Sequence, residues 1–303
     1  MIAAFAAVYI IWGSTYLAIR FAVETLPPFM MAGARFVISG LVLYVWASAQ
    51  GSDRPTRLQW RNTAIVGACL LLGGNGGVVW AEQIVPSGLT ALLVAILPFW
   101  IVLIDWIRPH GRRPSLGVVT GLIVGLVGLV VLIGPSALHT GAATSSGDGV
   151  TLIGAIVLVL ASLSWAIGSI FSQHAVLPKS AIIATGMEMI SGGVLLLIAS
   201  LLFREPMHFD LAGVSARSIG GFVYLTTVGS LVGFTAFIWL LSHQPSSRVA
   251  TYAYVNPVVA VFLGWAFAGE ALSLRTAIAA AIIIGAVAII TTARSSSPPQ
   301  EAA

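Results

Sequence analysis

Polar and aromatic side chains recur at helical spacing inside stretches of the sequence that are otherwise apolar. Residues four positions apart, such as Tyr252 and Asn256, share one face of a helix. Asn75 is an isolated amide in an apolar stretch, and its side chain needs a hydrogen-bonding partner or water. Groups of this kind can hold a small solute between aromatic walls without transforming it. The candidate substrate-binding residues are Trp12, Tyr16, Asn75, Trp100, Trp165, Ser169, Tyr252 and Asn256.

These residue types also have simpler interpretations. A serine in a membrane helix is often a packing residue, which applies to Ser162, Ser169 and Ser172. Tryptophan and tyrosine often form belts at the membrane–water interface, and this suits tryptophans near the ends of apolar runs. Trp12, Trp100 and Trp165 lie further in, so both a belt and a cavity wall stay open for them.

Four further residues are candidates for gating or for charge within the membrane. Arg35 and Glu188 are ionisable groups inside apolar runs, where such groups are functional candidates by default. They could pair, extend to the interface or face water. Pro98 and Pro257 each remove a backbone hydrogen bond and are expected to bend their helices. Three other acids, Glu82, Asp105 and Glu270, stand at predicted helix ends, where solvated carboxylates are ordinary.

Several functional classes lack the residues that they need. The sequence has no P-loop, no HExxH or GxSxG motif, and no cluster of histidine and cysteine for a metal. We therefore expect no enzyme activity, no cofactor and no metal. The predicted path has no basic cluster, which argues against phosphorylated substrates. Nucleic acid is not an expected partner either, because the basic residues stand in loops beside apolar runs.

The elements that position these residues must be membrane helices. Hydrophobic residues make up 58% of the 303 residues and charged residues only 8%, with a mean hydropathy of +1.00. The apolar runs are about 18 to 24 residues long, enough to cross a bilayer as helices. Both a lipid bilayer and a small-molecule substrate are therefore expected partners. The predicted helices span 3–23, 28–48, 60–82, 86–106, 115–134, 151–173, 180–203, 217–241, 246–267 and 274–292.

The basic residues predict the orientation. Loops near 49–61 and 107–114 hold six of the thirteen arginines, including Arg112 and Arg113, and Arg248 and Arg294 fall on the same side. By the positive-inside rule that side is cytoplasmic, and both termini then face the cytoplasm. The first helix lacks a basic leader region, so we expect it to be retained.

The sequence also repeats itself. At a shift of 153 residues Gly33 meets Gly186 and Trp12 meets Trp165, and at a shift of 159 residues Pro98 meets Pro257. Five helices are an odd number, so the second repeat enters the membrane from the opposite side, as in many secondary transporters. The predicted organisation is a first repeat at 1–134, a linker at 135–150, a second repeat at 151–292 and a disordered tail at 293–303.

The glycines of GGNGG, Gly73 to Gly77, fall inside the third predicted helix. In lipid a helix keeps its backbone hydrogen bonds because it has no alternative partners. Glycine at this place lets another helix come close or eases local unwinding. We expect a closely packed or flexible helix here and not a turn.

Several stretches resemble the EamA family of the drug/metabolite transporter superfamily. They are WGSTYLAIR, PPFMMAGARF, PSGLTALLVAILPFW and TYAYVNPVVAV, followed by the pair Gly269-Glu270. The resemblance implies ten transmembrane helices in an inverted five-plus-five repeat, in the manner of bacterial inner-membrane exporters of amino acids, aromatic ones among them, or of other small metabolites. Many members repeat the Gly-Glu pair after the fourth helix, whereas this chain has RPHGRRP there, without an acid.

We therefore expect a monomeric secondary transporter that works by alternating access. Aromatic walls of low charge suit a large zwitterionic amino acid, and they also suit a lipophilic cation through cation–π contacts. A drug-efflux transporter and a duplicated membrane protein that transports nothing stay open as alternatives. A passive pore would need a continuous polar lining, and a membrane enzyme would need a catalytic constellation.

Overall fold

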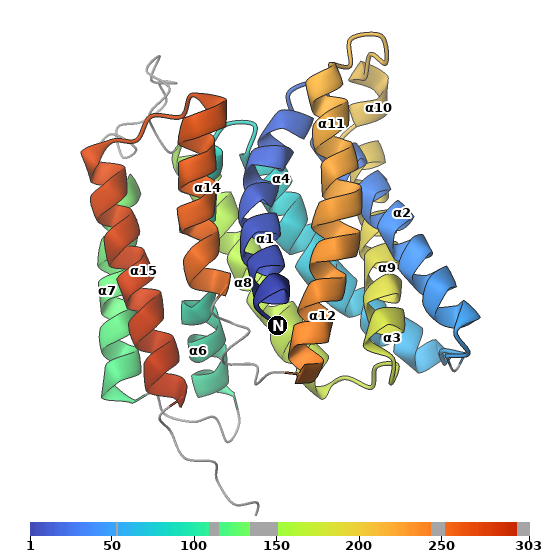
Figure 1. Ribbon diagram of the computed structural model, residues 1–303, viewed down its shortest axis with the longest axis horizontal. Coiled ribbons are helices and arrows are strands. Elements are labelled where there is room, and N and C mark those ends of the chain that lie inside the picture. Colours follow the sequence, from blue (N-terminus) through green and yellow to red (C-terminus); the bar gives the residue numbers. More distant parts are fainter. Residues whose placement is uncertain (53, 109–114, 134–150, 244–251, 296–303) are drawn as a thin grey trace, which may run out of the picture.

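The computed structural model describes residues 1–52, 54–108, 115–133, 151–243 and 252–295, and their regular structure is entirely helical (Figure 1). Seven helical stretches in these ranges are long and apolar enough to cross a membrane. Three shorter apolar helices lie at Leu116–Leu132, Val255–Ala268 and Leu274–Ile290. Each of the ten predicted ranges overlaps a helix. The described chain thus has the build of an all-helical integral membrane protein.

Helices of the first half begin where the sequence provides caps. Pro28 opens α2, where its missing N–H costs nothing. Thr56 and Gln59 form a capping box at α3, in which each side chain accepts a hydrogen bond from the other residue's backbone N–H. The elements are α1 (Ile2–Ala22), α2 (Pro28–Ala49), α3 (Arg57–Gly67), the π-helix η1 (Ala68–Asn75), α4 (Gly76–Ala81), α5 (Ser87–Val94), α6 (Leu97–Ile107) and α7 (Leu116–Ile133).

The second half uses the same kind of cap. Thr151, Ser180 and Ser215 each accept a hydrogen bond from a backbone N–H in the first turn of the helix that follows. Ser215 is the repeat mate of Thr56 at the shift of 159 residues. The elements are α8 (Leu152–His174), α9 (Ala181–Leu202), α10 (Glu205–His208), α11 (Ala216–Tyr224), the π-helix η3 (Leu225–Val232), α12 (Gly233–His243), α14 (Tyr252–Ala268) and α15 (Leu274–Ser295).

The glycine-rich stretch lies in and beside the π-helix η1, and close packing is confirmed. A Cβ on Gly73 would collide with the Ser164 hydroxyl oxygen and lie 2.9 Å from the Ser164 Cβ. A Cβ on Gly77 would lie 2.8 Å from the Cβ of Ala161. Both contacts are with α8, so the glycines let η1 and α4 approach that helix. The π-helix itself is a feature that the sequence pattern did not predict.

The two prolines behave differently. The predicted fourth helix is interrupted at Ala95–Ile96, and Pro98 falls in the first turn of α6, where its missing N–H is tolerated. Helix α14 continues through Pro257 without a break. Only Pro98 therefore coincides with a helix interruption.

Helices of the two halves pack in matching pairs. Helix α1 packs against α11, α12 and α14, and in the same way α8 packs against η1, α4, α5 and α6. Helices α2 and α9 cross where Gly193 faces the backbone of Gly33 and Gly40 faces the backbone of Gly186. Helices α7 and α15 form a further close pair at one side of the molecule (Figure 1).

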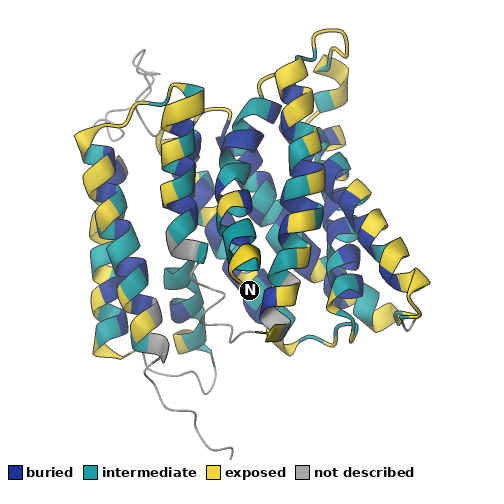
Figure 2. Ribbon diagram, viewed as in Figure 1, coloured by how far each residue is buried: buried dark blue, intermediate teal, exposed yellow. Residues whose placement is uncertain are grey.

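Burial is concentrated where the two halves meet, and outward faces of the helices are largely exposed and apolar (Figure 2). The N-terminal end of α1 and the C-terminal end of α15 both point to the lower end of Figure 1. We call the opposite end, where α1 and α4 end and α11 begins, the upper end. Arg112, Arg113, Arg248, the linker at 135–150 and residues 296–303 of the tail lie outside the described residues, as does the side chain of Arg294.

Candidate functional site

A central cavity lies where the two halves meet. The volume of this cavity that water can enter is about 140 Å³, whereas a single water needs only roughly 10–15 Å³ on the same measure. Its walls come from α1, α2, η1, α4, α8 and α14, with contributions from α5, α6 and α12. Of the predicted site residues, the cavity is lined by Trp12, Tyr16, Arg35, Asn75, Trp165, Tyr252 and Asn256.

One part of the cavity wall is aromatic. The Trp12 ring meets Phe234 at 5.4 Å and Tyr252 at 5.0 Å between centroids, both edge to face, and it meets Phe237 at 4.8 Å. Gly233 lies against the Trp12 indole, because a Cβ there would be 2.7 Å from Nε1. The indole is therefore fixed in place by α12 and α14. Contacts of this geometry suit another flat apolar group.

Three residues of the cavity lining each carry a buried polar atom that has no hydrogen-bonding partner among the described residues. The atoms are Nη1 of Arg35, Oδ1 of Asn75 and Oδ1 of Asn256. A buried polar group without a partner costs about 1–3 kcal/mol. Since the three residues line one cavity, a ligand that supplies one acceptor and two donors could satisfy all three atoms once their side chains turn toward it.

The second half of the chain holds Arg35 in place. The Arg35 Nε donates to the Ser230 hydroxyl at 2.9 Å, and a Cβ on Gly229 would lie 3.5 Å from Nη2. Both residues belong to the π-helix η3. The π-helix η3 thus supports the buried cation, and the π-helix η1 brings Asn75 to the cavity. Arg35 and Glu188 form no ion pair in the structure, and Glu188 is half-buried on α9.

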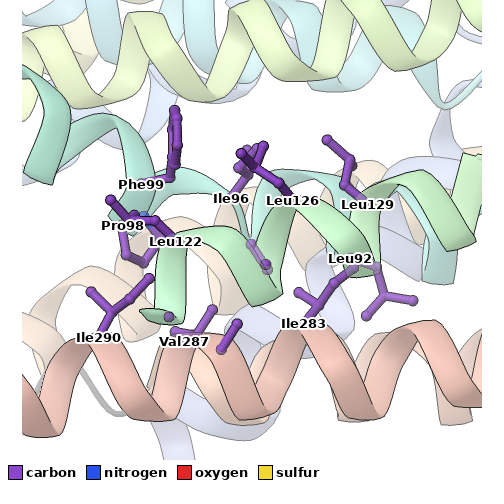
Figure 3. A pocket seen from close by; sticks show the side chains of 14 residues that line it. Leu92, Ile96, Pro98, Phe99, Leu122, Leu126, Leu129, Ile283, Val287 and Ile290 are labelled. Atoms are coloured by element: carbon purple, nitrogen blue, oxygen red, sulfur yellow. The ribbon is translucent and has the colours of Figure 1, made fainter. Parts of the chain in front are cut away.

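Five predicted residues lie away from the cavity lining, namely Trp100, Ser169, Glu188, Pro98 and Pro257. The Trp100 Nε1 donates to the Ser162 hydroxyl at 3.0 Å, so Trp100 touches the cavity wall through Ser162. Ser169 donates to the Trp165 carbonyl of its own helix at 2.8 Å, which fits a packing role. Pro98 lines a separate, small apolar pocket between α6, α7 and α15 (Figure 3).

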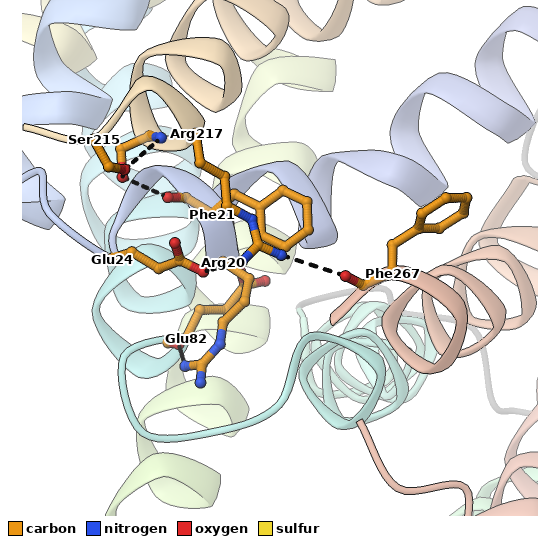
Figure 4. A network of polar contacts seen from close by, with 8 residues as sticks. Arg20, Phe21, Glu24, Glu82, Ser215, Arg217 and Phe267 are labelled. Carbon is orange, nitrogen blue, oxygen red and sulfur yellow. Dashed lines mark hydrogen bonds and ion pairs between the residues drawn. The ribbon is translucent and has the colours of Figure 1, made fainter. Parts of the chain in front are cut away.

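Above the cavity, polar contacts join the ends of several helices (Figure 4). The Arg20 Nη1 donates to the backbone carbonyl of Glu82 at 2.6 Å. Arg217 pairs with Glu24 at 3.3 Å and also donates to the Phe267 carbonyl. These contacts tie α1 to α4, and α11 to α1 and α14, at the upper end of the molecule.

The expectation of solvated carboxylates is wrong for Glu82 and Glu270. The Glu82 side chain is completely buried, and neither of its oxygens has a hydrogen-bonding partner in the described ranges. The Glu270 carboxylate accepts from the Ser87 N–H at 2.6 Å, the Ser87 hydroxyl at 2.8 Å and the Gly88 N–H at 3.0 Å. It therefore caps the N-terminus of α5 from the end of α14.

Sequence reasoning missed several residues of the site. Phe234 and Phe237 look like ordinary apolar residues, and only their position beside Trp12 distinguishes them. Ser230 aligns with Leu71 at the shift of 159 residues. Nothing in its residue type or spacing indicated that it belongs to the site. Glu82 could have been found from its place seven residues after Asn75, which puts both groups on nearly the same face of one helix.

Known proteins match this sequence along nearly the whole chain. The model of the EamA-like transporter family matches residues 1–134 and 152–292. The uncharacterized inner membrane transporter YedA of Escherichia coli K12 is 36% identical over 289 residues, covering 94% of this chain and 88% of YedA. The uncharacterized transporter YoaV of Bacillus subtilis 168 is 25% identical over 283 residues, covering 93% and 91% of the two chains.

A solved structure shares the fold. A crystal structure of another protein matches with a TM-score of 0.65 over 96% of both chains, at 22% sequence identity. Likeness at that level of identity concerns the fold alone.

Proposed function

Because the chain belongs to the EamA-like transporter family of the drug/metabolite transporter superfamily, and is therefore a membrane transporter, we propose that it exports large zwitterionic amino acids. The proposal covers aromatic amino acids and similar small metabolites. The proposed route leads from the cytoplasm across the inner membrane through the central cavity.

The observation that supports this substrate class is the set of three unpartnered polar atoms. A guanidinium N–H on Arg35 suits the carboxylate of an amino acid, because charge-assisted hydrogen bonds are the stronger kind. The amide oxygens of Asn75 and Asn256 are acceptors and suit the ammonium group. A zwitterion thus satisfies the donor and both acceptors at once.

The aromatic wall supports a large side chain. Trp12, Phe234 and Tyr252 present ring edges and faces beside the polar groups. Trp165, on α8, also lines the cavity. An aromatic pair contributes about 0.5–1.5 kcal/mol beyond area burial, so this wall favours aromatic over small amino acids.

Arg35 argues against the alternative of a lipophilic cation. A buried guanidinium with an unpaired N–H repels a second positive charge in a medium of low dielectric constant. A cation without a carboxylate would also leave that N–H unsatisfied. The same aromatic wall would otherwise suit both ligand classes.

We further infer ten transmembrane helices in an inverted five-plus-five repeat, with both termini cytoplasmic. The matched helix pairs, including the reciprocal glycine contacts of α2 and α9, support this arrangement. The inferred units are 1–134 and 151–292, joined by a linker at 135–150 and followed by the tail at 293–303. A monomer that alternates access without ATP is the corresponding mechanism.

The direct test is exchange of labelled L-phenylalanine in proteoliposomes, with phenethylamine and 3-phenylpropanoate as analogues that lack one charged group each. We expect the wild type to exchange phenylalanine far better than either analogue. Arg35→Gln should lose the preference for phenylalanine over phenethylamine, and should raise the half-saturating concentration by roughly 10- to 100-fold, as expected for a lost charged hydrogen bond of about 1.5–3 kcal/mol.

The matched control is Arg57→Gln, because Arg57 is exposed at the start of α3. This variant should retain the wild-type preference. Exchange of phenethylamine in preference to phenylalanine by the wild type would instead identify a transporter of lipophilic cations.

A further inference from the structure

Glu82 is a buried carboxyl group that the proposed substrate contacts do not use. Its side chain has no solvent exposure, and neither carboxylate oxygen has a hydrogen-bonding partner among the described residues. An ionised carboxylate in such surroundings is very costly, so this geometry suits the protonated, neutral form. A purely structural carboxylate would be expected to engage its oxygens, as Glu270 does.

Glu82 lies one helical turn from the cavity. Its backbone N–H donates to the carbonyl of Val78, and the Val78 side chain lines the cavity. On α1, Tyr16 lines the cavity and Arg20 follows one turn later. Glu82 and Arg20 therefore form the layer between the cavity and the upper end of the molecule.

The charged and titratable groups that act on Glu82 come from three elements. Arg20 contacts it from α1, and both Tyr16 on α1 and Glu270 after α14 lie near enough to interact with it electrostatically. The Arg20 guanidinium donates to the Glu82 backbone carbonyl at 2.6 Å, so it is held beside the carboxyl group without pairing with it. Rotation of the Glu82 side chain onto Arg20 would give an ion pair once the proton has left.

We propose that Glu82 binds and releases the proton that drives transport, so that the protein is a proton/solute antiporter. In the arrangement described above, in which this layer closes the upper end, the Glu82 carboxyl group is neutral and Arg20 donates to the Glu82 backbone carbonyl. When the proton leaves Glu82 for the cytoplasmic side, the carboxylate is compensated by Arg20. Opening of the upper end exposes this layer to the periplasm and allows a new proton to bind. The inference rests on the proposed transport function.

Proton binding at Glu82 can be tested without any substrate. Dicyclohexylcarbodiimide reacts with protonated carboxyl groups in apolar surroundings, and mass spectrometry identifies the modified residue. In the purified full-length protein we expect modification of Glu82 that falls at least about tenfold between mildly acidic and alkaline buffer. Absence of modification at Glu82, or modification that does not depend on pH, would overturn the proposal.

Coupling is tested in proteoliposomes with labelled L-phenylalanine as the probe. A pH gradient, acidic inside the vesicles, should drive uptake by the wild type. Glu82→Gln should lose this accumulation while exchange of phenylalanine remains measurable. Glu24→Gln is the matched control, because Glu24 is an exposed acid at the same end that pairs with Arg217. It should retain both activities.

The outcomes separate the two proposals. Gradient-driven uptake by Glu82→Gln at the wild-type level would refute a role for Glu82 in coupling while leaving amino-acid transport intact. Failure of the wild type to exchange phenylalanine would refute the proposed substrate. In that case the carbodiimide reaction still decides whether Glu82 binds a proton.

Discussion

A substitution at Asn256 tests one of the proposed polar contacts with the substrate. The amide oxygen of this cavity-lining residue is buried without a partner in the described part of the chain. Asn256→Leu keeps the approximate size and removes the acceptor. Because a net hydrogen bond contributes about 0.5–1.5 kcal/mol, we expect the half-saturating concentration of phenylalanine to rise by roughly two- to tenfold. Exchange kinetics at matched protein levels measure it.

Ser169→Ala is the companion variant. The Ser169 hydroxyl already donates to the Trp165 carbonyl of its own helix, and Ser169 does not line the cavity. We expect this variant to exchange phenylalanine with wild-type kinetics. A loss equal to that of Asn256→Leu would mean that Ser169 reaches the substrate in another conformation of the transporter.

At this scale, sequence reasoning works for residue types that are rare in lipid. Asn75, Asn256 and Arg35 stand out because a polar group in a membrane helix requires a partner. Glu82 does not stand out, because its depth depends on where the helix ends and on what covers that end. Phe234 cannot be distinguished from a lipid-facing phenylalanine without knowing which face of its helix is turned inward.

Among the elements, the contact of η1 with α8 gives a prediction about packing. Gly73→Ala places a Cβ against the hydroxyl and Cβ of Ser164. The two helices must separate, and overpacking of this kind costs about 1–3 kcal/mol. We expect a lower melting temperature in detergent. Gly285→Ala, on α15, is the control, because nothing lies within 4 Å of its added Cβ; an equal loss of stability there would contradict this explanation.

The cap that Glu270 places on α5 gives a prediction about gating. The carboxylate joins α14 to α5 through three hydrogen bonds, close to the layer of Arg20 and Glu82. Glu270→Gln should weaken the cap by about 0.5–2 kcal/mol and favour opening of the upper end. A cysteine at the buried, cavity-lining position of Ile19 should then react faster with an impermeant thiol reagent added outside.

Glu205→Gln is the comparison for this test. Glu205 accepts hydrogen bonds from the N–H groups of Phe29 and Met30 and so caps α2. Helices α2 and α9 are held along their length by glycine contacts, so loss of this cap should lower stability without exposing position 19. Faster labelling in both variants would show that general loosening, and not the α5 cap, controls access.

The helices themselves follow from sequence more readily than their irregularities. Runs of 18 or more apolar residues indicated each range, because a helix is the way for such a run to satisfy its backbone in lipid. The interruption before Pro98 fits its missing N–H, but α14 continues through Pro257, so a proline alone does not decide where a helix breaks. The π-helices η1 and η3 contact helices of the other half of the chain. The local pattern of apolar and polar residues therefore does not predict them.

For the whole molecule, thiol labelling tests the orientation. In a background with Cys69 replaced, a single cysteine at Ala212, beside α11 at the upper end, should react with an impermeant reagent added to intact cells. A cysteine at Gln50, at the lower end of α2, should react only after permeabilisation. Both positions are exposed in the structure. The opposite pattern would reverse the proposed direction of both repeats.

The proposed repeat was inferred from the sequence because identical glycines, prolines and tryptophans recur at nearly constant shifts. The way in which the halves interlock was not, since it depends on which faces meet. The reciprocal contacts of Gly33 with Gly193 and of Gly40 with Gly186 follow from an approximate twofold relation between α2 and α9. The spacing of the glycines predicts close contact with another helix. Which helix that is becomes known only from the three-dimensional structure.

The cap formed by Glu270 also has a kinetic consequence. The corresponding stretch of the first half, Arg108 to Pro114, contains no acid in the sequence, so we expect the two mouths of the carrier to be secured unequally. A carrier whose upper end is held closed by this cap rests with its lower end open. The solute therefore finds the binding site accessible from the cytoplasmic face and seldom accessible from the opposite face. The concentration for half-maximal flux should accordingly be lower on the cytoplasmic face, while detailed balance keeps the ratio of maximal rate to that concentration equal on both faces when no gradient is present.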